Sequence, residues 1–178
     1  MLKILLSALH TGLMVMMVMT SAFAADPLKI AFVDTGNTGR SMTSAALAQQ
    51  WVVKHHANIS IISRAVNMNP YNVTPEPDFV RLLKPLGIDV SSHRAAQIDK
   101  SVISFSDYIF VMSPSHRQRI LADYPDAASK VHLLAEFATG TPTEVLDAYG
   151  QNSAFYDKVF KQISELIPLA LEKLPKSV

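Results

Sequence analysis

The chain has 178 residues, about the length of one ordinary domain, and no cysteine. The missing cysteine excludes disulfides, thiolate metal sites, lipid anchoring through a cysteine and catalysis by a thiol. The chain carries 16 Lys and Arg residues against 15 Asp and Glu residues, and such a near-neutral chain without a basic run argues against nucleic acid as a partner.

The first 24 residues have the pattern of a secretory signal peptide. Lys3 precedes an apolar stretch from Ile4 to Met19, and Ala22-Phe23-Ala24 places small residues at the two positions that a signal peptidase reads. We expect cleavage after Ala24, which removes one basic residue and leaves a neutral domain over residues 25–178. An uncleaved membrane anchor is the alternative, because the apolar run approaches spanning length. A cleaved signal predicts a secreted or periplasmic protein without stable membrane insertion.

From residue 28 onward, short apolar runs alternate with amphipathic stretches, which is typical of βα units around a parallel sheet. We predict one doubly wound α/β domain, with a mainly four-stranded parallel sheet and helices on both faces. The predicted strands are Leu28–Asp34, Ile59–Ala65, Tyr108–Met112 and Val131–Leu134. The predicted helices are Ser41–His55, Pro75–Leu86, Ser115–Asp123 and Ser153–Leu174, with a short one after Gln97.

The segment Asp34-Thr35-Gly36-Asn37-Thr38-Gly39-Arg40-Ser41 joins the first predicted strand to the first predicted helix. Its small residues let successive backbone N–H groups converge on an oxyanion, and the start of the helix adds partial positive charge. Arg40 would add a two-pronged clamp. Ligands in parallel sheets bind beyond the carboxyl ends of the strands, which is where this loop falls. The loop is therefore predicted to bind phosphate or another oxyanion.

The loop resembles the phosphate-binding loop of the low-molecular-weight protein tyrosine phosphatases, which reads Val-Cys-x-Gly-Asn-x-Cys-Arg-Ser-Pro. The chain matches this pattern at Val33, Gly36, Asn37, Arg40 and Ser41. Asp34 stands where the family has its catalytic cysteine, Gly39 where many members have a second cysteine, and Met42 where they have proline. The cradle is kept and the attacking sulfur is missing.

The resemblance covers most of residues 28–174. Its further matches are Ser63 after the second predicted strand, Ser91-Ser92-His93-Arg94, the strand from Ser106 to Met112, and Glu144 to Gly150, which aligns with the family's Asp-Pro segment. The resemblance implies that Asn37 holds a strained loop conformation and that Ser63 and His93 hydrogen-bond to it from behind. The alternative makes His93 an ordinary turn residue and Ser63 a satisfied strand end.

Through the same resemblance, Asp147 corresponds to the general acid that protonates the leaving phenolate. A solvated loop carboxylate is the alternative. Ala148 replaces the family's proline, and Tyr149 is expected either to line the entrance or to anchor its loop. Ser41 is expected to cap the first helix and also, as in the family, to face the nucleophile position.

Asp34 leads to two opposed interpretations. Its carboxylate is expected either to pair with Arg40 as a built-in anion, which would make the site self-inhibited, or to attack phosphorus, as in enzymes that form an aspartyl phosphate. Those enzymes usually neutralise charge with a metal, and the sequence has no metal-binding motif, so no metal and no other cofactor is expected. Arsenate reduction, known in a related family, is disfavoured because it relies on cysteines.

The leading prediction is an exported, phosphatase-like protein with weak or no tyrosine phosphatase activity, which binds phosphate, another oxyanion, a phosphorylated ligand or a protein partner. Its candidate catalytic residues are Asp34, Arg40 and Asp147, and its candidate loop-bracing residues are Asn37, Ser63 and His93. The alternatives are an active phosphomonoesterase that uses Asp34 as nucleophile or base, and a non-catalytic interaction scaffold.

Overall fold

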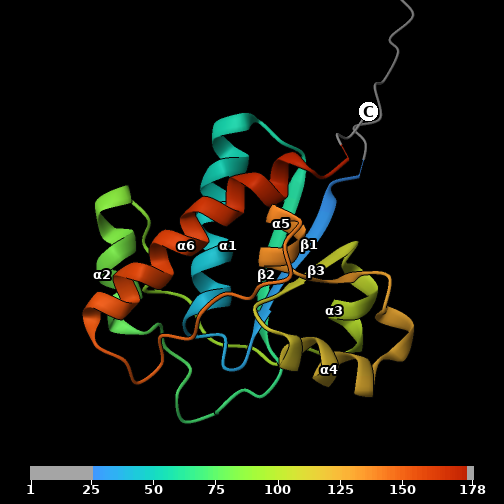
Figure 1. Ribbon diagram of the computed structural model, residues 1–178, viewed down its shortest axis with the longest axis horizontal. Helices are drawn as coiled ribbons and strands as arrows, with labels where there is room; N and C mark the ends of the chain where they lie inside the picture. The colour runs from blue at the N-terminus through green and yellow to red at the C-terminus, as the bar shows by residue number, and fades with distance from the viewer. Residues whose placement is uncertain (1–25, 176–178) are drawn as a thin grey trace, which may run out of the picture.

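Four parallel strands form the centre of the structure, a computed structural model that describes residues 26–175 (Figure 1). The strands β1 (Leu28–Asp34), β2 (Ile59–Ala65), β3 (Tyr108–Val111) and β4 (Val131–Leu133) lie in the order β2-β1-β3-β4. Every neighbouring pair is parallel. The apolar run 30–33 of the central strand is fully buried, as expected for a strand that is covered on both faces. The predicted four-stranded parallel sheet is confirmed.

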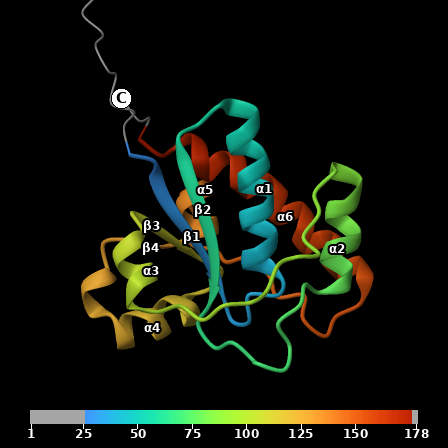
Figure 2. The same ribbon diagram turned by 180° about the vertical axis from the view of Figure 1, so that it is seen from behind.

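Helices cover both faces of this sheet, as the opposite views in Figures 1 and 2 show. On one face lie α1 (Arg40–His55), α2 (Pro77–Leu83), α5 (Leu134–Thr139) and α6 (Ser153–Glu172), which share a core with Ile30 and Phe32 of β1. On the other face lie α3 (Lys100–Phe105) and α4 (Pro114–Asp123), which pack with Ala31 and Val33. Alternate residues of β1 therefore enter opposite cores, and the predicted doubly wound arrangement is confirmed.

Several elements differ from their predicted limits. The expected helix over 75–86 is α2 followed by a single 3-10 turn, η1 (Lys84–Leu86), and Gly87 ends it with a φ of 73°. The first helix begins at Arg40 with Gly39 as its N-cap, so the prediction that Ser41 caps this helix is wrong. Strands β3 and β4 end one residue earlier than expected, and α6 ends at Glu172.

Two short elements were not predicted, namely α5 and the 3-10 turn η2 (Pro125–Ala127). α5 has 6 residues and η2 has 3, and neither length allows an amphipathic repeat to show in the sequence.

Over residues 26–175 the structure contains no helix that is long and apolar enough to cross a membrane. The expected signal segment, residues 1–24, lies outside the described residues. The signal peptide, its cleavage after Ala24 and the export of the protein therefore stay predictions.

Candidate functional site

The loop Asp34–Ser41 lies at the carboxyl edge of the sheet, where β1 ends. Two backbone hydrogen bonds fasten its first residues to the segment after β2: Val66 donates to the carbonyl of Asp34 and Asn67 to that of Thr35, both at 2.9 Å. Asn37 has a φ of 59°, in the left-handed region that asparagine tolerates better than most residues. The strained conformation expected at Asn37 is therefore present.

Four hydrogen bonds hold Asn37 in this conformation, and its side chain and its carbonyl make three of them. Its side-chain Nδ2 donates to Ser41 Oγ at 3.0 Å, and its Oδ1 accepts from the backbone N–H of Ala96 at 3.1 Å. Its backbone carbonyl accepts from His93 Nε2 at 2.7 Å. His93 therefore braces the loop, through the backbone of Asn37. The bond expected from Ser63 is not made, because Ser63 pairs in register with Phe32, two residues before the end of β1.

Asp34 is buried, with 3% of its surface exposed, and its carboxylate turns back into its own loop. One oxygen accepts from the backbone N–H of Asn37 at 2.5 Å, and the other accepts from the backbone N–H of Ser41 at 2.8 Å. The Asp34 carboxylate thus occupies two of the backbone N–H donors that the loop could offer to an anion. This arrangement corresponds to the built-in anion expected from the sequence.

The ion pair expected between Asp34 and Arg40 is replaced by another. Arg40 Nη2 donates to Asp147 Oδ2 at 2.7 Å, and Nη1 donates to the carbonyl of Val145 at 3.2 Å. Asp147 Oδ1 in turn accepts from the backbone N–H of Tyr149 at 3.1 Å. Both oxygens of Asp34 already accept backbone bonds, so the guanidinium pairs with the carboxylate that the 141–152 segment brings to it. The Asp147 side chain remains 56% exposed.

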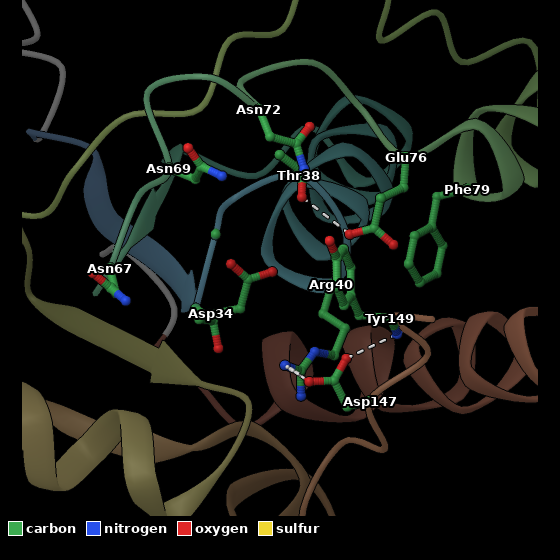
Figure 3. A pocket seen from close by; sticks show the side chains of 12 residues that line it. Asp34, Thr38, Arg40, Asn67, Asn69, Asn72, Glu76, Phe79, Asp147 and Tyr149 are labelled. Carbon is green, nitrogen blue, oxygen red and sulfur yellow. Dashed lines mark hydrogen bonds and ion pairs between the residues drawn. The ribbon is translucent and has the colours of Figure 1, made fainter. Parts of the chain in front are cut away.

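A cavity of about 200 Å³ opens in front of the loop (Figure 3). Its walls come from the loop itself, from the 67–79 segment and from the 147–149 segment. The lining residues are Asp34, Thr35, Gly36, Thr38, Arg40, Asn67, Asn69, Asn72, Glu76, Phe79, Asp147 and Tyr149. Tyr149 lies exposed at the rim, which agrees with its expected place at the entrance.

Glu76 lines the cavity and was not among the predicted site residues. Its Oε1 accepts from Thr38 Oγ1 at 3.0 Å and its Oε2 accepts from the Tyr156 hydroxyl at 2.7 Å. Burial raises the pKa of the Glu76 carboxyl above its usual value of 4.5, the two hydrogen bonds oppose this rise, and the carboxylates of Asp34 and Asp147 add to it. Its partners stand 38 and 80 residues away in the sequence, so no local pattern marked it.

Gly39 makes room for the Glu76 carboxyl. A Cβ at position 39 would lie 2.6 Å from Glu76 Oε1 and 3.1 Å from Phe79 Cε2, and real Cβ atoms essentially never approach another atom as closely as the first of these. In the position where Thr38 and Tyr156 hold it, the carboxyl of Glu76 leaves no room for a Cβ at the position where the resembling phosphatases often carry a second cysteine.

His116 is a second site residue that the sequence did not indicate. Its Nε2 lies 2.9 Å from Thr35 Oγ1 and its Nδ1 lies 3.1 Å from Ser113 Oγ. Burial and, to a smaller extent, the charge of Arg40 lower the pKa of His116 from 6.5 to about 4, against the opposite influence of Asp34 and Asp147. His116 on α4 thus contacts the loop at Thr35, in addition to the contact of His93 at Asn37.

No group of three or more His, Asp or Glu side chains that could hold a metal ion occurs in the part of the chain from 26 to 175. The chemistry available in the cavity is that of carboxylates, amides, one guanidinium, hydroxyls and backbone N–H groups.

Comparison with known proteins gives one consistent result. The family model described as low molecular weight phosphotyrosine protein phosphatase matches residues 29–178. The protein-arginine-phosphatase of Geobacillus stearothermophilus is 29% identical over 148 residues, which cover 83% of this chain and 97% of that protein.

Solved structures agree with this result. A mutant of YwlE from Bacillus subtilis superposes with a TM-score of 0.78 at 27% identity, covering 82% of this chain and 97% of that one. A YwlE arginine phosphatase variant with a phosphorylated active-site serine superposes with the same TM-score at 26% identity, covering 83% of this chain and 95% of that one.

Proposed function

Since this chain belongs to the low-molecular-weight phosphotyrosine protein phosphatase family, we propose that it is a disarmed member whose phosphate loop is occupied by its own aspartate. The chain has no cysteine, so a phosphocysteine intermediate cannot form. We assign it weak or no phosphatase activity and a weakened affinity for phosphate.

One observation carries this proposal: the carboxylate of Asp34 accepts the backbone N–H groups of Asn37 and Ser41. Those donors are then satisfied without a ligand. The carboxylate also puts a negative charge at the base of the cradle, where an incoming phosphate would meet it. Two like unit charges 4 Å apart repel by about 4 kcal/mol at an effective dielectric constant of 20, so the buried carboxylate opposes the anion that the loop was shaped to hold.

The pairing of Arg40 supports the same proposal. Its guanidinium would be the second attraction for a phosphate, and it is held by Asp147 at 2.7 Å and by the carbonyl of Val145. An anion must therefore compete with a charge-assisted hydrogen bond inside the protein before it gains the arginine.

Turnover of p-nitrophenyl phosphate by the mature domain tests the proposal. Wild type and Asp34→Ala are expected to show no turnover above buffer, whereas Asp34→Cys is expected to gain activity because the loop, Arg40 and Asp147 remain in place. The double variant Asp34→Cys/Arg40→Lys is the matched control, and it should lose most of that gain, since lysine cannot clamp a phosphoryl group with two donors. Turnover by wild type that Asp34→Ala abolishes would overturn the proposal.

A second candidate is a covalent role for Asp34, as nucleophile of a slow phosphomonoesterase. The support is the YwlE variant whose active-site serine is phosphorylated, because there an oxygen side chain holds the phosphoryl group. In this chain each oxygen of Asp34 already accepts a backbone hydrogen bond, which makes it a weaker nucleophile. A phosphoryl group on Asp34 that hydroxylamine removes, detected by mass spectrometry after incubation with p-nitrophenyl phosphate, would establish this role.

We also propose that the protein is exported with cleavage after Ala24. The signal-like pattern of residues 1–24 and the complete lack of oxidisable thiols support this proposal. Amino-terminal sequencing of the protein from a periplasmic or secreted fraction should begin at Ala25. A full-length protein that stays with the membrane fraction would contradict it.

A further inference from the structure

The cavity has more negative than positive groups. The carboxylates of Asp34, Glu76 and Asp147 line it, and Arg40 is the one basic side chain among the described residues that line it. Arg40 already pairs with Asp147. The remaining carboxylates accept hydrogen bonds only from neutral groups: Asp34 from two backbone N–H groups, and Glu76 from two hydroxyls. No basic side chain lining the cavity is therefore left to balance the charge of Asp34 and Glu76.

The size and walls of the cavity limit what fits. Its volume of about 200 Å³ is below the roughly 300–1,000 Å³ of sites for drug-sized molecules, so it has room for one side-chain-sized group. The aromatic rings of Phe79 and Tyr149 lie on one side, and the amides of Asn67, Asn69 and Asn72 lie on another (Figure 3). The walls thus combine aromatic faces, amides and surplus carboxylates.

We propose that this cavity binds the guanidinium group of an arginine side chain in place of a phosphate group. The inference rests on the proposed function, because a loop that recruited phosphate would fill the same space with an anion. A guanidinium is flat, permanently charged and carries five donors, so it pairs with carboxylate oxygens while its face stacks on an aromatic ring. An ammonium group lacks the flat face and the fork.

Glu76 is the residue that gives the cavity its preference for a guanidinium group. A carboxylate has about four lone-pair positions, and two of those of Glu76 are used by the hydroxyls of Thr38 and Tyr156. The other positions are available to a ligand, and the two hydroxyl bonds hold the group in place. The glycine at position 39 allows this carboxyl to lie beside the loop.

The test uses calorimetric titration of the mature protein with four probes at pH 7.5: N-acetyl-arginine methylamide, its neutral citrulline isostere, free arginine and inorganic phosphate. The blocked arginine is expected to bind about tenfold more tightly than the citrulline probe, as one charge-assisted hydrogen bond allows. Glu76→Gln should remove most of that preference. Glu165→Gln, which removes a carboxylate from the exposed face of α6, should leave it unchanged. Free arginine shows whether the ligand is the amino acid or a residue within a chain, since the two arginine probes differ only in the blocked ends.

Equal binding of the arginine and citrulline probes, no binding of either arginine probe, or an unchanged preference in Glu76→Gln would overturn the inference. Tighter binding of phosphate than of both arginine probes would overturn it as well. Its failure is distinguishable from that of the proposed function, because wild-type turnover of p-nitrophenyl phosphate that Asp34→Ala abolishes refutes the proposed function whatever the arginine probes do. If the protein shows no turnover and also does not bind the arginine probes, only the proposed guanidinium site is refuted.

Discussion

The guanidinium of Arg40 and the carboxylate of Asp147 form an ion pair of 2.7 Å between residues 107 positions apart in the sequence. Arg40 belongs to the loop that resembles a phosphate cradle, and Asp147 belongs to the segment that resembles the carrier of a general acid. Each therefore holds the group that a phosphatase would direct at its substrate. Together with the bonds of Asp34, this pair explains why the site is expected to receive phosphate poorly.

Replacing Asp147 with Asn is expected to strengthen the binding of inorganic phosphate about two- to fivefold. The change releases Arg40 and removes one negative charge, and the effect is limited because exposed ion pairs contribute about 1 kcal/mol or less. Calorimetric titration measures it. Asp157→Asn is the matched control, since Asp157 has a side chain exposed to 55% and also pairs with an arginine. An equal change in both variants would contradict the role given to Asp147.

Replacing Asp34 with Ala should lower stability and raise anion affinity together. The N–H groups of Asn37 and Ser41 lose their acceptor, which costs about 1–3 kcal/mol for a buried unsatisfied donor. The two free N–H groups and the loss of the negative charge both favour the binding of an added anion. Phosphate should therefore raise the melting temperature of the variant more than that of wild type.

Asp34→Asn separates charge from hydrogen bonding in that experiment, because the amide keeps one acceptor oxygen but carries no charge. Its phosphate affinity should lie between those of wild type and Asp34→Ala. If phosphate binds Asp34→Ala no better than wild type, the aspartate does not obstruct the cradle.

Substituting Gly39 with Ala is expected to destabilise the fold by about 1–3 kcal/mol, the usual range for an overpacked site. The new methyl group would displace the Glu76 carboxyl from Thr38 and Tyr156 and press on Phe79. Urea denaturation measures the change. Gly36→Ala is the control in the same loop, because a Cβ there meets only Thr38 Oγ1 at an ordinary 3.6 Å.

The double variant Gly39→Ala/Glu76→Ala tests whether the clash with the Glu76 carboxyl causes the destabilisation of Gly39→Ala. It should be less destabilised than the sum of its single variants, since removal of the carboxyl makes room for the new methyl group. If the changes in unfolding free energy of the two single variants simply add, the destabilisation by Gly39→Ala does not come from the Glu76 carboxyl.

His116 should make stability depend on pH in mildly acidic solution. Its pKa is lowered from 6.5 to about 4 by burial, so the unfolded chain takes up a proton in this range before the native protein does. The resulting stability is present above pH 6.5 and is lost as the pH falls towards 4, by up to about 3 kcal/mol at 1.36 kcal/mol per pKa unit. His116→Asn should flatten the dependence of the unfolding free energy on pH between 6.5 and 4.

The same substitution at the exposed His55 should leave that dependence as it is in wild type. An unchanged slope in His116→Asn would mean that His116 is already protonated in the native protein.

The fold and the conformation of the 34–41 loop could be predicted from the sequence to different extents. The alternation of apolar strands and amphipathic helices predicted the sheet and both helical layers, because burial on two faces imposes a pattern on neighbouring residues. The left-handed conformation of Asn37 and its brace by His93 followed from the resemblance. The first residue of α1 and the limits of the 75–86 helix did not follow, because caps depend on backbone geometry that propensity describes poorly.

The succession of a strand, a small-residue loop and a helix, and the carboxylate at the position of the attacking sulfur, follow from the chain alone. These are local facts of chain order and residue type. The partners of the charged groups depend on the folded arrangement: Arg40 pairs with Asp147, Asp34 accepts from the backbone of its own loop, and Glu76 lines the cavity. Each outcome depends on competition among partners that folding brings together from distant segments, and burial strengthens the pairing that wins.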